Sequence, residues 1–112
     1  MLTIDKLREY GANVEEGLAR CINNEDFYIK MINIAIADPN FEKLESSLDS
    51  DDLDTAFEAA HALKGMLGNL SLTPIYDPVY EITELLRGRK GMDYTPYLNT
   101  ILEQLKALKE LA

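Results

Sequence analysis

The feature that most constrains the fold of this chain is the spacing of its apolar residues, which recur every three to four positions over most of its length. Such spacing is typical of helices that bury one face, and no segment shows the period of two expected of a half-buried strand. The longest run, residues 52–72, would span about 30 Å. One side of it is apolar: Leu53, Ala56, Ala60, Leu63, Leu67 and Leu70. We therefore expect an all-α protein whose core includes this stripe.

Capping residues and glycines divide the rest of the chain into further helices. Thr3 can cap a first helix that stops at Gly11, and Asn13 followed by Glu16 has the spacing of a capping box. The later helices are expected to begin at polar or proline-containing pairs, namely Asn23-Asn24, Asp38-Pro39, Thr73-Pro74 or Asp77-Pro78, and Thr95-Pro96.

Short connections favour antiparallel neighbours, so residues 1–112 are expected to form one antiparallel up-down four-helix bundle with additional short N-terminal helices. The helix that runs to about Arg87 contains Pro78, which is tolerated only in a first turn. We therefore expect that helix to begin late or to be kinked. Residues 88–91 read as a loop.

Composition limits the possible partners and the compartment. The net charge of −9 makes nucleic acid and anionic membranes poor partners. No apolar run approaches the ~20 residues of a membrane span, and the start lacks the pattern of a secretory signal, so a cytoplasmic location is expected. The single cysteine, Cys21, excludes an intramolecular disulfide and reads as a buried small hydrophobe rather than a reactive thiol.

Metal and nucleotide sites have no sequence support. One histidine and one cysteine are too few ligands for a structural zinc site, and the carboxylates lack the spacing of a calcium loop. The chain also has no glycine-rich phosphate loop, so we expect no metal, no nucleotide cofactor and no ATP-dependent kinase activity.

The segment "EAAHALKGMLGNL", residues 58–70, places unusual residues in a helix. His61 lies on the flank of the apolar stripe, and Gly65 and Gly68 follow one and two turns later. Lys64, three residues after His61, lies between the histidine and the edge of the core face. Each glycine inside a helix costs roughly 0.5–1 kcal/mol relative to alanine. Bare backbone and a cation beside an imidazole suit an exposed nucleophile with an anionic reaction partner.

A structural explanation accounts for the same residues. The two glycines could serve only close packing of a neighbouring helix, and the histidine could be a passive residue at the edge of the core. Geometry on a helical wheel leaves both explanations open.

The same stretch closely resembles the signature His-x-Leu-Lys-Gly of histidine-containing phosphotransfer (HPt) domains. The segment "NVEEGLARCINNEDFYIKMINIAIADPNFEKLESSL" resembles the helices that precede the motif in that family, and the helix pair after the motif is similar too. The resemblance covers nearly the whole chain, which looks like a stand-alone bacterial HPt protein.

The resemblance implies a histidine phosphocarrier of a phosphorelay, a phosphotransfer intermediate rather than an independent catalyst. The outer ring nitrogen of His61 would accept a phosphoryl group from a receiver aspartate or a sensor kinase and pass it to another receiver aspartate. Lys64 would stabilise the group and Gly65 would leave room for it. Other residues expected to meet a partner are Gly68 and Asn69 and, with less support, Thr83 and Arg87 on the neighbouring helix.

The implied partners are receiver domains of response regulators, a hybrid sensor kinase, or both, with Mg²⁺ held by the receiver and this chain acting as a monomer. Many family members carry glycine ten residues after the histidine, where this chain has Ser71, so that turn is expected to end or pack differently. The alternatives are a bundle of this family that binds partners without phosphotransfer, and an unrelated structural bundle.

Overall fold

The computed structural model describes residues 1–112 and contains seven helices and no strand. The all-α prediction is confirmed. The helices are α1 (Ile4–Tyr10), α2 (Val14–Arg20), α3 (Glu25–Ile36), α4 (Asn40–Asp49), α5 (Leu53–Asn69), α6 (Thr73–Arg87) and α7 (Thr95–Leu111).

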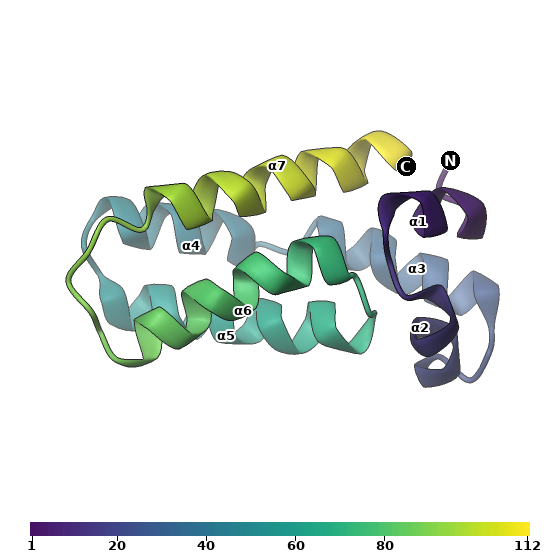
Figure 1. Cartoon of the computed structure of the whole chain (residues 1–112), viewed down its shortest axis with the longest axis horizontal. Coiled ribbons are helices and arrows are strands. Elements are labelled where there is room, and N and C mark those ends of the chain that lie inside the picture. Colours follow the sequence, from purple (N-terminus) through teal and green to yellow (C-terminus); the bar gives the residue numbers. More distant parts are fainter.

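The last four helices form the antiparallel bundle that the short connections predicted (Figure 1). Helix α5 packs against α4 on one side and α6 on the other, and α7 packs on α6. The short helices α1 and α2 lie at one end of the bundle, next to α3, and both chain termini are at this end. None of the seven helices is both long and apolar enough to cross a membrane.

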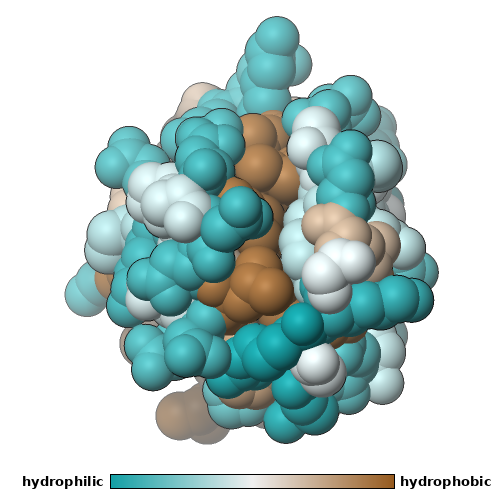
Figure 2. Space-filling model, turned by 90° about the vertical axis from the view of Figure 1, so that its left-hand side faces the viewer, coloured by the Kyte–Doolittle hydropathy of each residue, from teal (hydrophilic) through white to brown (hydrophobic).

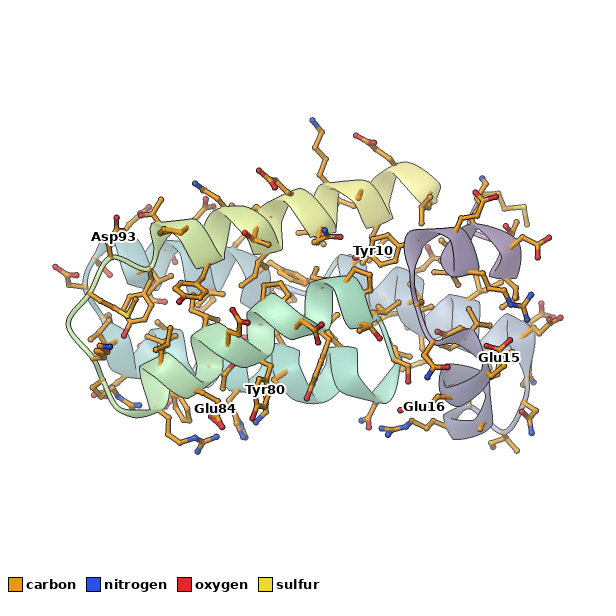
Figure 3. The ribbon with its side chains drawn as sticks, in the orientation of Figure 1. Tyr10, Glu15, Glu16, Tyr80, Glu84 and Asp93 are labelled. Carbon is orange, nitrogen blue, oxygen red and sulfur yellow. The ribbon has the colours of Figure 1, made fainter.

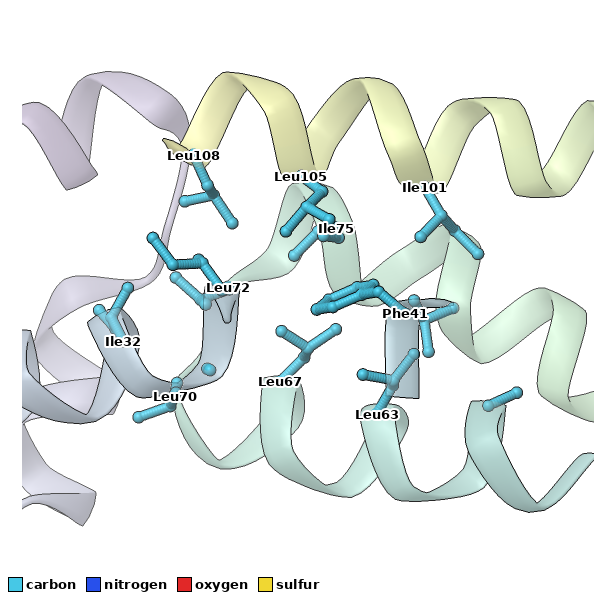
Figure 4. Close-up of a cluster of buried hydrophobic side chains, with 14 of the residues drawn as sticks. Ile32, Phe41, Leu63, Leu67, Leu70, Leu72, Ile75, Ile101, Leu105 and Leu108 are labelled. Carbon is cyan, nitrogen blue, oxygen red and sulfur yellow. The ribbon is translucent and has the colours of Figure 1, made fainter. Parts of the chain in front are cut away.

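The core is made of apolar side chains that the bundle helices direct at one another (Figure 4). Leu63 and Leu67 of α5 point into the space below α7, from which Ile101 and Leu105 point back. The buried residues of α5 are Ala56, Ala59, Ala60, Leu63 and Leu67. Burial of this stripe fixes the rotation of α5 about its axis and so decides which of its residues face the solvent.

Leu53, expected in the core, is only half-buried, because it lies at the open end of the bundle. This end carries a strip of hydrophobic surface between hydrophilic side chains (Figure 2). A small cavity of about 120 Å³ there is lined by Leu53 together with Leu48, Met92 and Leu98.

Side-chain caps start the helices where the sequence indicated. Thr3, Asn13 and Asn24 each accept a hydrogen bond from the backbone N–H three residues later, and Asp52 does the same at the head of α5. Gly11 ends α1 with φ +109°, in the left-handed region that favours glycine.

One predicted boundary is wrong, because helix α5 ends at Asn69 rather than near residue 72. Of the two starts predicted for α6, the structure has the earlier one, Thr73, so this helix does not begin late. The carbonyl of Leu72 accepts hydrogen bonds from the N–H groups of Ile75 and Tyr76, at 3.2 and 2.8 Å, which forms the first turn before Pro78 is reached. Pro78 then lies inside the helix and deprives only one carbonyl of its usual donor.

The turn between α5 and α6 is fastened to the N-terminal helices. The last carbonyls of a helix have no partner within it. Here the Tyr28 hydroxyl donates to the carbonyl of Leu70 at 2.8 Å, and the N–H of Asn13 donates to the carbonyl of Ser71 at 2.9 Å. Burial raises the pKa of Tyr28 to about 12. A Cβ at Gly17 would lie only 2.5 Å from the Tyr28 hydroxyl, so this glycine makes room for the anchor.

Ser71 occupies a strained position in this turn, and we predict that Ser71→Gly stabilises the protein. Its φ is +54°, it is buried, and its hydroxyl has no hydrogen-bond partner. Glycine adopts this conformation without the steric penalty and removes the unpaired hydroxyl. We expect the free energy of unfolding in urea to rise by about 1 kcal/mol. A decrease in the free energy of unfolding would show that the serine side chain stabilises the turn rather than straining it.

Candidate functional site

His61 lies near the middle of α5 and is exposed to solvent. Its neighbours Ala60 and Leu63 are buried against the other helices, which places the imidazole on the outer flank of the bundle. The position agrees with the helical wheel drawn from the sequence.

An aromatic ring supports the imidazole from the preceding turn. The rings of Phe57 and His61 stack with their centroids 5.6 Å apart and an angle of 27° between their planes. Two guanidinium groups lie against the same phenylalanine: the Cζ atom of Arg87 is 5.1 Å from the ring centroid and that of Arg89 is 4.6 Å from it. Each of these guanidinium groups also pairs with a carboxylate, Arg87 with Glu84 and Arg89 with Asp54.

Lys64 supplies a cation on the following turn. Its Nζ lies 5.5 Å from the centroid of the Tyr80 ring on α6, a cation–π contact that holds the long side chain beside the surface of the bundle. Figure 3 shows Tyr80 and Glu84 on α6, on the side of the molecule where α5 lies.

A carboxylate borders the site as well. Glu84 accepts a hydrogen bond of 2.9 Å from Nε of Arg87, and this contact holds the pKa of Glu84 below its ordinary value. The positive charges of Arg87, Lys64 and protonated His61 act in the same direction. Arg87 is thus paired in this structure, while Lys64 forms no ion pair.

The two glycines of the motif have different roles. A Cβ built on Gly65 would meet no atom within 4 Å, so this strip of backbone faces open space. A Cβ on Gly68 would lie 3.0 Å from Cε1 of Tyr76 on α6. Gly68 therefore serves close packing between α5 and α6, one of the explanations the sequence left open, whereas packing does not explain Gly65.

A polar cavity of about 450 Å³ adjoins the bare strip. Lys64, Gly65, Gly68 and Asn69 of α5 line it, and the opposite walls come from α2 and from the start of α6. The Arg20 guanidinium of α2 donates to the carbonyl of Gly68 at 3.5 Å and to Oδ1 of Asn69 at 3.4 Å. Asn69 is thus at the same surface as Lys64, as the sequence suggested, but it is also tied to the N-terminal helices.

One expected surface residue is not on the surface. Thr83 is fully buried, and its hydroxyl donates to the carbonyl of Val79 at 2.6 Å. It was predicted, with Arg87, to meet a partner from the neighbouring helix, but it lies on the core face of that helix. Arg87 itself is exposed and lies beside Phe57.

Three residues of this surface were missed in the sequence. Phe57 could have been found, because it precedes His61 by four positions and so shares its face of the helix. Tyr80 and Arg89 carry no comparable signal, since their approach to α5 depends on how α6 and the loop after it pack. No group of three or more His, Cys, Asp or Glu side chains is placed to hold a metal ion.

Comparison with known proteins finds one family whose model matches the chain. The family model of the Hpt domain matches residues 34–111, well over half of the chain, from the end of α3 through α7. This range includes His61, Lys64 and Gly65, whereas α1, α2 and most of α3 lie outside it. None of the curated proteins and none of the solved structures matches the chain.

The contrast between the two glycines predicts different effects of the same substitution on stability. Gly65→Ala adds helix propensity in open space and should raise the free energy of unfolding by about 0.5–1 kcal/mol. Gly68→Ala gains the same helix propensity but forces Tyr76 to move. Its free energy of unfolding should therefore rise by less than that of Gly65→Ala, or fall. Denaturant unfolding of the two variants checks this, and equal gains would contradict the assigned packing role of Gly68.

Proposed function

The chain belongs to the Hpt domain family, and we propose that it acts as a histidine phosphocarrier with His61 as the phosphorylated residue. Hpt domains take part in histidine phosphotransfer and interact with receiver domains in phosphorelays. The observation that carries the proposal for this chain is an exposed imidazole beside the unobstructed backbone of Gly65. Gly65 itself presents no side chain to a phosphoryl group that approaches His61 from this side.

The proposed step exchanges one bond to phosphorus for another. A ring nitrogen of neutral His61 uses its lone pair to form an N–P bond with the phosphoryl group of a receiver's aspartyl phosphate. The P–O bond to the aspartate breaks, and its electron pair stays with the released carboxylate. Transfer onward to a second receiver runs the same exchange in reverse. Such in-line transfer depends mainly on positioning and on neutralising charge at the equatorial oxygens.

Lys64 is proposed to neutralise part of that charge. It lies one turn after His61, forms no ion pair, and is held only by the Tyr80 ring, so its ammonium group is free to meet a phosphoryl oxygen. Arg87 stands on the other side of the imidazole but already pairs with Glu84. We assign the larger share of phosphoryl stabilisation to Lys64.

Residues 1–112 act together as one domain and as a monomer in the cytoplasm, between receiver domains or between a hybrid sensor kinase and a receiver. The chain does not use ATP itself and depends on its partners for phosphoryl groups. Gly65 and Asn69 lie on the surface that meets the receiver.

We predict that His61→Gln folds normally and accepts no phosphoryl group. Glutamine keeps the size and polarity of an exposed side chain but lacks the nucleophilic ring nitrogen, so stability should stay within about 0.5 kcal/mol of the wild type. The assay mixes each protein with a receiver domain charged by radiolabelled acetyl phosphate and follows the label. Label on wild type alone supports the proposal, whereas equal label on His61→Gln refutes it.

Lys64→Ala should slow transfer about tenfold without abolishing it, because one exposed cation is lost while the nucleophile remains. Lys64→Arg is the matched control and should keep most of the rate. Rapid-quench measurements with the charged receiver provide the rates. An unchanged rate in Lys64→Ala would remove this residue from the mechanism while leaving the role of His61 intact.

A further inference from the structure

The imidazole of His61 is oriented by ring stacking rather than by hydrogen bonding. It is exposed, and its close partner is the Phe57 ring 5.6 Å away. An exposed side chain without a partner samples several rotamers, and only one of them directs a given ring nitrogen along the line of attack. The stack therefore bears directly on how often the nucleophile is ready to react.

Phe57 is itself held in place from two sides. It is half-buried and packs against the hydrophobic core, which limits its own rotamers. On its exposed part lie the guanidinium groups of Arg87 and Arg89. Because these contacts restrict the motion of the Phe57 ring, the ring restricts the imidazole more than a mobile surface side chain would.

Arg89 is the more strongly fixed of these two arginines. Its Nε donates to Oδ1 of Asp54 at 2.6 Å, and one terminal nitrogen donates to the carbonyl of Leu86 at 2.7 Å. Asp54 precedes Phe57 on the same helix, so the guanidinium connects the loop after α6 to the first turns of α5. The result is an ordered series of planar groups, Arg89, Phe57 and His61, on the outer face of the bundle.

We infer that Phe57 is a positioning residue for His61, with Arg89 as its anchor. The inference rests on the proposed function and deepens it by naming what orients the nucleophile. Neither residue touches the phosphoryl group. Phe57 limits the rotamers of the His61 imidazole by stacking on it, and Arg89 limits the rotamers of Phe57.

The test compares Phe57→Leu with Phe57→Tyr. Leucine keeps the apolar contact with the core but cannot stack, and tyrosine keeps the ring. Phosphorylation is measured with phosphoramidate, a small donor that needs no docking surface, and then with a charged receiver. In Phe57→Leu we expect the maximal rate to fall about three- to tenfold with both donors, while the KM for the receiver is unchanged. Phe57→Tyr should restore the wild-type rate, and circular dichroism checks that both variants are folded.

A second readout does not depend on transfer. The proton resonances of the only imidazole in the chain should lose the ring-current shift and the single-rotamer couplings in Phe57→Leu and keep them in Phe57→Tyr. A wild-type rate in folded Phe57→Leu, or a change in KM alone, overturns the positioning role and leaves the phosphocarrier intact. A wild-type protein that accepts no phosphoryl group from either donor overturns both.

Discussion

Burial of the apolar stripe of α5 is the constraint on which the rest of the structure depends. Because Ala56, Ala60, Leu63 and Leu67 must face α4 and α6, the helix cannot rotate, and His61 is held at the solvent edge. Small alanines in the N-terminal half of the stripe let the neighbouring helices approach closely, and leucines fill the space in its C-terminal half. The geometry of the proposed reaction therefore follows from core packing that involves none of the reacting atoms.

The surface around His61 is assembled by the elements next to α5. Helix α6 brings Tyr80 to Lys64, and the loop after it brings Arg89 to Phe57. At the C-terminal end of α5, Tyr28 and Asn13 donate hydrogen bonds to carbonyl groups of the turn that follows. In this turn the residue with a positive φ is Ser71 rather than a glycine. Tyr28 and Asn13 lie outside residues 34–111, the part of the chain that matches the Hpt family model.

Local rules predicted most of the architecture. The apolar period, the asparagine and threonine caps and the glycine after α1 are local signals, and the helices begin at these caps as expected. Contacts between helices decide what the sequence left open: α6 begins at Thr73 with Pro78 inside it, and Tyr76 of that helix packs against the bare backbone of Gly68. The prediction of Thr83 as a surface residue was wrong because this residue belongs to the buried stripe of α6, with Val79, Ile82 and Leu86. The pairing of Phe57 with Arg89 depends on a loop conformation that no sequence spacing specifies.

The most direct measurement of the central claim is a nitrogen-15 spectrum of the imidazole before and after incubation with a charged receiver. His61 is the only histidine in the chain, so its two ring nitrogens are assigned without ambiguity. The account predicts that one ring nitrogen shifts and couples to phosphorus, and that acid treatment restores the original spectrum while base does not. Protein that acquires phosphate while both ring nitrogens keep their original resonances would contradict it.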